Sequence, residues 1–216
     1  MRKYRDRNEA GKRLAEELAG FNAEKDAVVL GLPRGGVPVA AEVARALHAP
    51  LGVFVVRKLG VPGNEEYAMG AIASGGARVL NEDVVRSLRI SDEQVAQVVA
   101  RETKNLRKRE EAYRGKAPQP ELEGKLVILV DDGVATGATV RVAVKALRKY
   151  RPRKIVVAVP VAPPEACRDL SREVEELVCP LQPLHLGAVG LWYDDFSATT
   201  DEEVRQTLVH AGAGPL

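Results

Sequence analysis

Four short apolar runs, all rich in β-branched residues, alternate with helical patterns along this chain and limit the folds open to it. Runs of this kind are typical of strands buried on both faces of a parallel sheet. Helical patterns lie between them, at residues 37–47, 91–113 and 137–150. The order predicts a three-layer α/β fold, with helices on both faces of an open, mainly parallel sheet. The predicted strands are Ala27 to Leu30, Leu51 to Val56, Leu126 to Val130 and Ile155 to Val159.

Length and composition predict one domain spanning residues 1–216, because 45% hydrophobic and 29% charged residues suit a single core. The 32 basic and 30 acidic side chains nearly balance, so we expect no nucleic-acid partner. No apolar run approaches the ~20 residues of a membrane span, and the charged start lacks a signal-peptide core. We therefore expect a cytoplasmic protein without a membrane partner. Residues 179–216, with their prolines, glycines and aromatic cluster, are predicted to form a small hood.

Two other features are expected to serve structure and not chemistry. Cys167 and Cys179, with only three histidines in the chain, cannot supply a zinc cluster at the usual spacings. Buried free thiols are the expected state of these cysteines, and the sequence leaves a disulfide between them open. Near the start, Asp6-x-x-Glu9 followed by apolar residues at helical spacing predicts a short amphipathic helix, for which we expect a packing role.

The most informative segment begins where the strand Leu126 to Val130 ends. Asp131 and Asp132 follow directly, and a loop of small and hydroxyl residues, with Thr136 and Thr139, then leads into a helix. Small side chains let backbone N–H groups converge on an anion, and the helix start adds about half a positive charge. Carboxylates beside a phosphate must face something else, such as sugar hydroxyls or a divalent cation. The segment therefore predicts a sugar-phosphate site; the alternative is a strand cap followed by a plain turn.

This segment resembles the phosphoribosyl pyrophosphate (PRPP) binding motif of type I phosphoribosyltransferases. The resemblance implies that the two acids bind the ribose 2′ and 3′ hydroxyls, and that the loop from Ala135 to Thr139 holds the 5′-phosphate. Gly133 departs from the aliphatic residue common at its position. The residues of this motif that are implied to bind PRPP are Asp131, Asp132, Gly133, Val134, Ala135, Thr136, Gly137, Ala138 and Thr139.

A glycine-rich turn follows the strand that ends at Leu30. It resembles the pyrophosphate loop of the family. The resemblance implies that Arg34 and the amides of Gly35 and Gly36 contact pyrophosphate. A guanidinium fork and bare backbone suit a multiply charged anion. The alternative is an ordinary turn with a solvated arginine.

A basic pair follows the strand that ends at Val56. Arg57 and Lys58 resemble the pyrophosphate-contacting pair of the family, and the glycine and proline loop after them resembles its mobile loop. Such a loop would close over the site and exclude water. Glu65 or Glu66, brought in by this closure, would then supply any proton transfer. The alternative is a plain surface loop.

Two features bear on the acceptor. Trp192, Tyr193 and Phe196 gather in the predicted hood, where a planar base would stack on their rings; the alternative is that they fix the tail to the core. Relatives acting on hypoxanthine and guanine carry an aspartate where this chain has Ala135, whereas adenine-type relatives share the alanine. The resemblance thus leaves the acceptor open and argues against the first substrate pair.

The resemblance implies an enzyme of nucleotide metabolism, in purine or pyrimidine salvage. It would transfer the 5-phosphoribosyl group of PRPP to a nitrogen acceptor, for which we expect a nucleobase, and release pyrophosphate. Mg²⁺ would bridge the PRPP oxygens through water, with the two acids as side chains within its reach. Type I relatives are commonly dimers, so we expect a homodimer. The residues expected to take part in catalysis are Arg34, Lys58, Glu65, Glu66, Asp131 and Asp132.

A different class of function shares the same loops. A PRPP- or nucleotide-sensing regulator would keep the fold and the binding residues without transferase turnover. It would need a basic nucleic-acid surface, and residues 101–111, the one candidate, interleave acids with their bases as a solvated helix face does. A PRPP-forming diphosphokinase resembles two fused domains and needs a longer chain, and a silent scaffold would not need all three loops.

Overall fold

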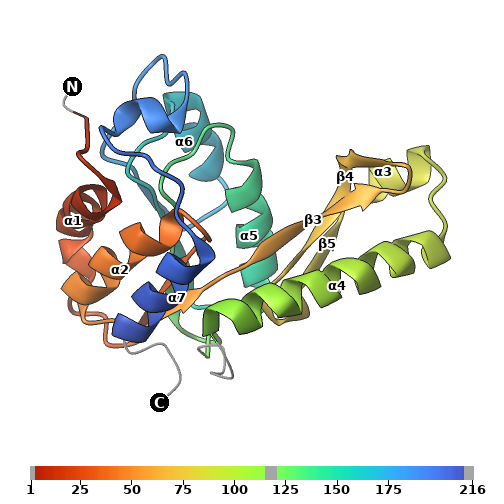
Figure 1. Ribbon diagram of the computed structural model, residues 1–216, viewed down its shortest axis with the longest axis horizontal. Helices are drawn as coiled ribbons and strands as arrows, with labels where there is room; N and C mark the ends of the chain where they lie inside the picture. The colour runs from red at the N-terminus through yellow and green to blue at the C-terminus, as the bar shows by residue number, and fades with distance from the viewer. Residues whose placement is uncertain (1–2, 115–120, 212–216) are drawn as a thin grey trace.

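The computed structural model describes residues 3–114 and 121–211. In these ranges the chain forms a body and an arm that projects from one side of it (Figure 1). We define the arm as residues 56–114 and the body as residues 3–55 and 121–211. Among the described residues, no helix is long and apolar enough to cross a membrane.

A five-stranded parallel sheet forms the centre of the body, in the strand order β2-β1-β6-β7-β8. The central strand pair β1 and β6 is in register from Ala27 opposite Leu126 to Gly31 opposite Val130. Their carboxyl ends therefore lie side by side, which brings the loops that follow them to the same place on the sheet edge. The predicted parallel α/β fold is confirmed. The strands are β1 (Ala27–Gly31), β2 (Leu51–Val53), β6 (Leu126–Val130), β7 (Lys154–Ala158) and β8 (Glu176–Val178).

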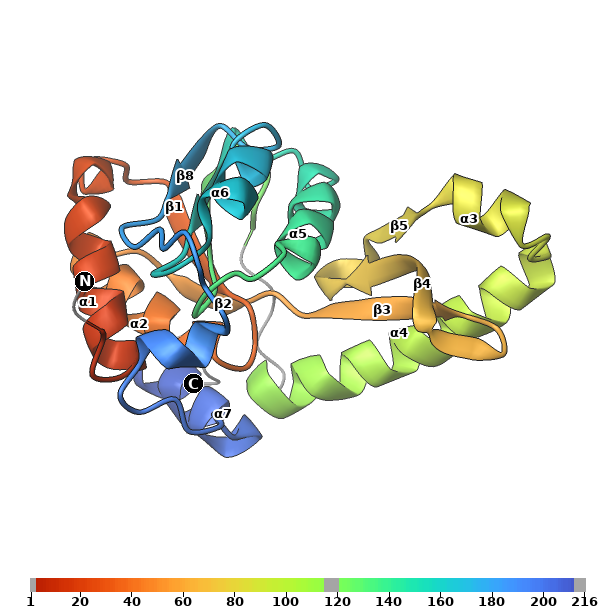
Figure 2. The ribbon, with the colours of Figure 1, turned by 90° about the horizontal axis from the view of Figure 1, so that it is seen from above.

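Helices cover both faces of this sheet, as Figure 2 shows from above. Alternate residues of β1 face opposite sides: Val29 packs into the cluster of α1, α2 and α7, whereas Val28 and Leu30 pack into the cluster of α5 and α6. Every residue of β1 and β6 is buried, as the uninterrupted apolar runs predict. The helices of the body are α1 (Arg7–Glu17), α2 (Gly36–Leu47), α5 (Ala138–Arg148), α6 (Pro164–Leu170) and α7 (Asp201–His210).

The arm is an antiparallel three-stranded sheet with a long helix running beside it (Figures 1 and 2). The helix was predicted from its pattern and begins with the expected reciprocal bonds between Ser91 and Gln94. The predicted loop after the basic pair is instead a hairpin, whose turn lies between Val61 and Asn64. The arm elements are β3 (Val56–Val61), β4 (Asn64–Ala73), β5 (Arg78–Leu80), α3 (Glu82–Ser87) and α4 (Asp92–Arg114).

The predicted strand Leu51 to Val56 is two strands of different sheets, so that part of the prediction was wrong. β2 ends at Val53, and the chain crosses into the arm through Phe54 and Val55, which are both buried. The crossing is fixed by Ser74, whose hydroxyl accepts from Val55 N at 2.8 Å and whose N–H donates to Val55 O at 2.8 Å. Because both crossing residues are apolar and buried, the sequence shows no break there.

The hood crosses the carboxyl end of the sheet and returns along α2. Residues 179–211 of it are described, and residues 212–216 of the predicted segment lie outside the described ranges. Its short 3₁₀ helix, Val189–Trp192, leads to Tyr193, which bridges to Tyr4 near the N-terminus. Both cysteines are free thiols, as expected, but only Cys167 is buried, whereas Cys179 is partly exposed. The remaining 3₁₀ helices among the described residues are Ala19–Phe21 and Ser74–Gly76.

Candidate functional site

Two loops predicted to bind one ligand meet at the carboxyl ends of β1 and β6. The amide of Leu32 donates to Val130 O at 2.9 Å, which carries the β1 loop past the end of β6. A Cβ added at Gly35 would lie 1.9 Å from Asp132 Oδ2, and one added at Gly36 would lie 2.8 Å from the Cα of Asp131. Only residues without a side chain allow this approach. The glycine-rich loop and the acidic pair therefore form one site.

Burial sets the electrostatics of the acidic pair. It raises the pKa of Asp131 well above its ordinary range, and the neighbouring charge of Asp132 raises it further. Burial also raises the pKa of Asp132, but the guanidinium of Arg7 opposes that shift. Asp131 Oδ1 accepts from the amide of Asp132 at 2.9 Å. A site that holds two carboxylates so closely gains from a ligand with hydroxyl donors or a cation.

Arg7 is a site residue that the sequence reasoning missed. It belongs to the first turn of α1, the helix expected to serve packing alone, and its Nε lies 2.8 Å from Asp132 Oδ2. The predicted helix is confirmed, and Asp6 is its N-cap, because Asp6 Oδ1 accepts from Glu9 N at 2.8 Å. The helix therefore does more than pack, because its Arg7 side chain contacts Asp132. Nothing in the local pattern around Arg7 distinguishes it from a solvated arginine.

Residues of the hood also reach the acidic pair. The hydroxyl of Tyr193 donates to the backbone oxygen of Asp132 at 2.5 Å, and its ring is only 4% exposed. Phe196 lies beside Tyr193, with 4.9 Å between ring centroids, and Trp192 Nε1 donates to Leu186 O at 3.0 Å. Tyr193 thus fixes the tail to the core. Phe196 and Trp192 are half-buried, and their base-stacking role stays a prediction.

The hood also accounts for Gly133, the departure from the family pattern. A Cβ at this position would lie 2.4 Å from Val189 Cγ1 and 3.0 Å from Val161 Cγ1. Two valines therefore occupy the space that a side chain at residue 133 would need. One of them, Val189, belongs to the hood, so a hood side chain packs directly on the backbone of Gly133.

The predicted phosphate loop lies between β6 and α5. Thr136 and Thr139 are exposed at the start of α5, where a helix N-terminus favours an anion. Val134, by contrast, is 3% exposed, and its amide donates to Val161 O at 2.9 Å. Val134 therefore anchors the loop, whereas its neighbours carry the groups open to a ligand. The loop residues at solvent are Ala135, Thr136, Ala138 and Thr139.

Arg34 reaches α7 and not the acidic pair. Its Nη1 lies 3.9 Å from Asp201 Oδ1, and both side chains are about half exposed. Asp201 also accepts from the hydroxyl of Tyr113 at 2.8 Å. Burial and this bond to a carboxylate raise the pKa of Tyr113 to about 12. The long exposed contact leaves the guanidinium free to turn toward a pyrophosphate.

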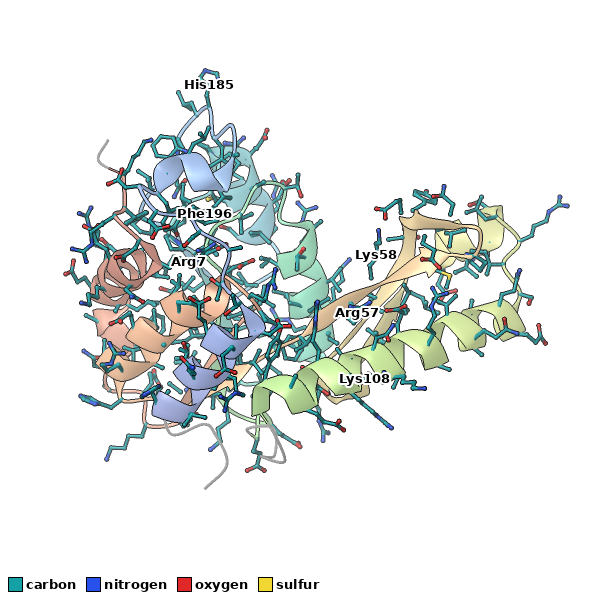
Figure 3. The ribbon with its side chains drawn as sticks, in the orientation of Figure 1. Arg7, Arg57, Lys58, Lys108, His185 and Phe196 are labelled. Atoms are coloured by element: carbon teal, nitrogen blue, oxygen red, sulfur yellow. The ribbon has the colours of Figure 1, made fainter. Side chains whose placement is uncertain are left out.

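The predicted residues of the arm are paired within the arm. Arg57 Nη2 lies 2.7 Å from Glu102 Oε2, and Lys58 Nζ lies 3.1 Å from Glu66 Oε2. Burial raises the pKa of Glu102, but its bonds to Arg57 and to another arginine of α4 outweigh this and hold the pKa below its usual range. Figure 3 shows Arg57 and Lys58 on β3 in the arm, apart from Phe196 in the body. The structure thus does not join the basic pair to the acidic pair.

Glu65 and Glu66, the predicted proton-transfer residues, lie at the start of β4. Glu65 Oε1 is 3.0 Å from Arg101 Nη1, and the side chain of Glu66 is 96% exposed. Both carboxylates are therefore on the arm surface in this conformation. Their role stays a prediction that needs movement of the hairpin.

The described residues offer Mg²⁺ a small set of oxygen ligands. No group of three or more histidine, cysteine or acidic side chains in these ranges could hold a metal alone. Asp131 and Asp132 nonetheless supply carboxylates at the point where the two loops meet. Mg²⁺ commonly binds through one or two carboxylates together with substrate phosphates, so the donor set fits that mode.

Comparisons with known proteins identify the family of the chain. A model of the phosphoribosyl transferase domain family matches residues 4–180. A protein of Mycobacterium tuberculosis, named as an inferred phosphoribosyl transferase, is 44% identical over 204 residues, which are 94% of this chain. The matched region is 46% of that protein, so the chain spans less than half the length of this curated relative.

A solved structure has the same fold over nearly the whole chain. The crystal structure of TT1426 from Thermus thermophilus is 46% identical and has a TM-score of 0.84. The match covers 97% of this chain and 99% of that one. A shorter match, 34% identical over 58 residues, links 27% of this chain to 28% of a uracil phosphoribosyltransferase from Aquifex aeolicus.

Proposed function

Because the chain belongs to the phosphoribosyl transferase domain family, we propose that it transfers the 5-phosphoribosyl group of PRPP to a nitrogen acceptor and releases pyrophosphate. The observation that carries the proposal is the contact of Asp131 and Asp132 with Gly35 and Gly36. One loop supplies carboxylates for sugar hydroxyls, and the other supplies the bare backbone and guanidinium that suit pyrophosphate. A ligand that carries sugar hydroxyls and a pyrophosphate on one ring fits the place where the two loops meet.

The proposed catalysis rests on positioning. The start of α5 would hold the 5′-phosphate, the acidic pair the ribose, and the loop of Arg34 the pyrophosphate. Anchoring PRPP at both ends holds C1 in line for attack, and such positioning contributes on the order of 7 to 11 kcal/mol. Arg57 and Lys58 would stabilise the leaving charge after the arm hairpin moves toward the body.

The proposed reaction depends on Mg²⁺, which would neutralise charge on the departing pyrophosphate. Asp131 and Asp132 are the residues that would hold the ion together with PRPP oxygens. PRPP affinity measured with Mg²⁺ and with excess chelator tests this. Equal affinities in the two conditions would contradict the dependence.

The proposed acceptor is a nucleobase-like molecule, and Trp192 and Phe196 are the rings on which it would stack. Ala135 argues against hypoxanthine and guanine. We assign any proton transfer to Glu65 or Glu66. If Glu65→Gln and Glu66→Gln both keep the wild-type turnover, that assignment is wrong.

The experiment that tests the proposal is pyrophosphate release from Mg-PRPP against a panel of nucleobases, adenine and uracil included, and small amines. The control is the Asp131→Asn, Asp132→Asn protein, in which PRPP binding should be lost while the fold remains. Acceptor-dependent release that the control lacks would support the transferase. Unchanged PRPP affinity in the control would overturn the site.

Tight PRPP binding without release for any acceptor would instead favour the sensing regulator. The charges of α4 weigh against a nucleic-acid surface, because Arg101 pairs with Glu65 and Glu102. Salt-sensitive retention of DNA or RNA would argue for it. The proposed homodimer is tested separately, by light scattering of the purified chain.

A further inference from the structure

The main chain around Arg7 is fixed before the side chain makes any contact. The segment ahead of α1 pairs with the hood, because Tyr4 N donates to Trp192 O at 2.9 Å and Asp195 N donates to Arg5 O at 2.8 Å. The N-cap then sets where the helix begins. Arg7 therefore leaves the backbone at a defined point between the hood and the acidic pair.

Three contacts hold the guanidinium of Arg7. Its Nε lies 2.8 Å from Asp132 Oδ2, its Nη1 donates to Ser197 O at 2.7 Å, and its central carbon lies 4.0 Å from the ring centroid of Phe196. Figure 3 shows Arg7 and Phe196 together in the body. The side chains of Arg7 and Asp132 are 12% and 16% exposed. A pair this shielded keeps its geometry better than an exposed one, whose side chains are free to move.

The same pair touches the pyrophosphate loop. The position that a Cβ of Gly35 would occupy lies 1.9 Å from Asp132 Oδ2 and 3.1 Å from Arg7 Nε. The ion pair thus packs on the backbone of that loop, and a turn of the Asp132 carboxylate would break the contact with Arg7. A carboxylate has two oxygens, and fixing one of them leaves the other in a defined place for a sugar hydroxyl.

We propose that Arg7 is a positioning residue for ribose recognition, which orients Asp132 by holding one of its carboxylate oxygens. This inference rests on the proposed function, because it gives Asp132 a sugar hydroxyl to bind. Arg7 itself acts through Asp132 and contacts no reacting atom. The N-terminal helix and the hood therefore contribute to the site through one side chain.

The test compares two probes, ribose 5-phosphate and inorganic phosphate, by titration calorimetry. Both engage the phosphate loop, but only the first has sugar hydroxyls. Arg7→Ala should weaken ribose 5-phosphate binding by roughly 10- to 100-fold, as expected for the loss of a hydrogen bond to a charged group. Phosphate affinity should stay within about threefold, because the start of α5 does not contact Arg7.

The matched control is Arg13→Ala on the same helix. Arg13 pairs with Glu9 at 2.7 Å, and its guanidinium lies 5.6 Å from the ring of Tyr4, so it resembles Arg7 in its kinds of contact. This variant should bind both probes as the wild type does. Arg7→Lys keeps a charge and a donor and should recover part of the lost affinity.

An equal loss for both probes in Arg7→Ala would show a general structural role and overturn the inference, as would unchanged ribose 5-phosphate affinity. A lysine variant no better than alanine would do the same. Should the alanine variant not fold, Arg7→Gln, which keeps the size but not the charge, is judged by the same difference between probes. If the wild type itself binds ribose 5-phosphate no better than phosphate, the proposed function fails, and this inference with it.

Discussion

The loops of the body and the hairpin of the arm hold their charged residues in different ways. In the body, main-chain pairing of β1 with β6 and contact with glycine backbone place the acidic pair. In the arm, Arg57 and Lys58 are held by side-chain ion pairs with Glu102 and Glu66. Exchange of ion-pair partners in the arm breaks no main-chain hydrogen bond, whereas moving the body loops would break the bond from Leu32 N to Val130 O and the packing on Gly35 and Gly36. The body therefore holds the preformed part of the proposed site, and the arm holds the proposed part that can change its contacts.

The largest effect should come from removing the close contact in the body. Gly35→Ala places a methyl group 1.9 Å from Asp132 Oδ2, which forces one loop to move. PRPP affinity should fall by about 100-fold or more, since overpacking costs about 1–3 kcal/mol and misplaces both loops. Gly63→Ala in the arm turn is the control: its φ is +80° and nothing lies within 4 Å.

That control should lose about 1 kcal/mol of stability from backbone strain, with PRPP affinity close to the wild type. Calorimetry and urea unfolding on both variants give the two quantities. If the arm variant loses as much affinity as the body variant, the distinction between a preformed body and an adjustable arm is wrong.

The next effect should loosen the arm alone. Glu102→Ala leaves Arg57 without its partner, and Glu102 is only 6% exposed. Losing bonds to a charged group there should cost about 2 kcal/mol, after allowance for the partial exposure of Arg57. Amide exchange should speed up in β3 and β4 and stay unchanged in β1 and β6. Glu111→Ala, at an exposed site of the same helix, should change neither the stability nor the amide exchange.

Faster exchange in β1 or β6 of the Glu102 variant would contradict the separation of the two regions. Unchanged amide exchange in β3 and β4 would contradict it as well, because Glu102 would then not hold β3 to α4.

A smaller effect should follow pH. The pKa of Asp131 is raised by burial and by the charge of Asp132, so between the unfolded pKa and the folded pKa the folded state holds a proton that the unfolded chain has released. This contribution to stability is present below the unfolded pKa, about 3.9, and is lost as pH rises through the folded pKa. Asp131→Asn should therefore stabilise the free protein at pH 7, because the uncharged amide avoids the cost of burying a carboxylate.

Asp26 is the contrasting case. A hydrogen bond from Arg153 lowers the pKa of Asp26. The contribution of Asp26 to stability is therefore present above the unfolded pKa and is lost as pH falls through the folded pKa. Asp26→Asn should reduce the loss of stability on acidification, and Asp131→Asn should reduce the loss as pH rises. Urea unfolding between about pH 2 and pH 8 covers both changes, because the Asp26 contribution is lost only below the unfolded pKa of about 3.9. Equal slopes in the wild type and Asp131→Asn would contradict the prediction for Asp131.

Sequence alone placed the body loops together because parallel strands end at one edge of the sheet. To apply that rule, only the two apolar runs that form β1 and β6 have to be recognised in the sequence. It failed for the run from Leu51 to Val56, since the buried Phe54 and Val55 conceal the passage into a second sheet. The turn signal of Pro62 and Gly63 favours a loop, although in the structure it closes a hairpin.

Arg7 could not be found in this way. Its contact with Asp132 joins residues 125 positions apart, and no periodic pattern or strand-end rule links α1 to that loop. The aromatic cluster of the hood was visible in the sequence, but only the structure shows that Tyr193 fixes the tail to the core, through the bond of its hydroxyl to the Asp132 backbone. The stacking role of the other two rings stays a prediction. Contacts between elements depend on how those elements pack, which local sequence does not determine.

The smallest effect should come from the exposed arm pair. Glu66→Gln breaks the 3.1 Å contact with Lys58, whose side chain is 44% exposed while that of Glu66 is 96% exposed. Such pairs contribute little in water, so unfolding should change by less than about 0.5 kcal/mol, and 1 M salt should remove most of that difference. A loss above about 1 kcal/mol would mean that the pair holds the hairpin. With stability unchanged, any fall in turnover of this variant reports on the chemistry of the arm and not on its folding.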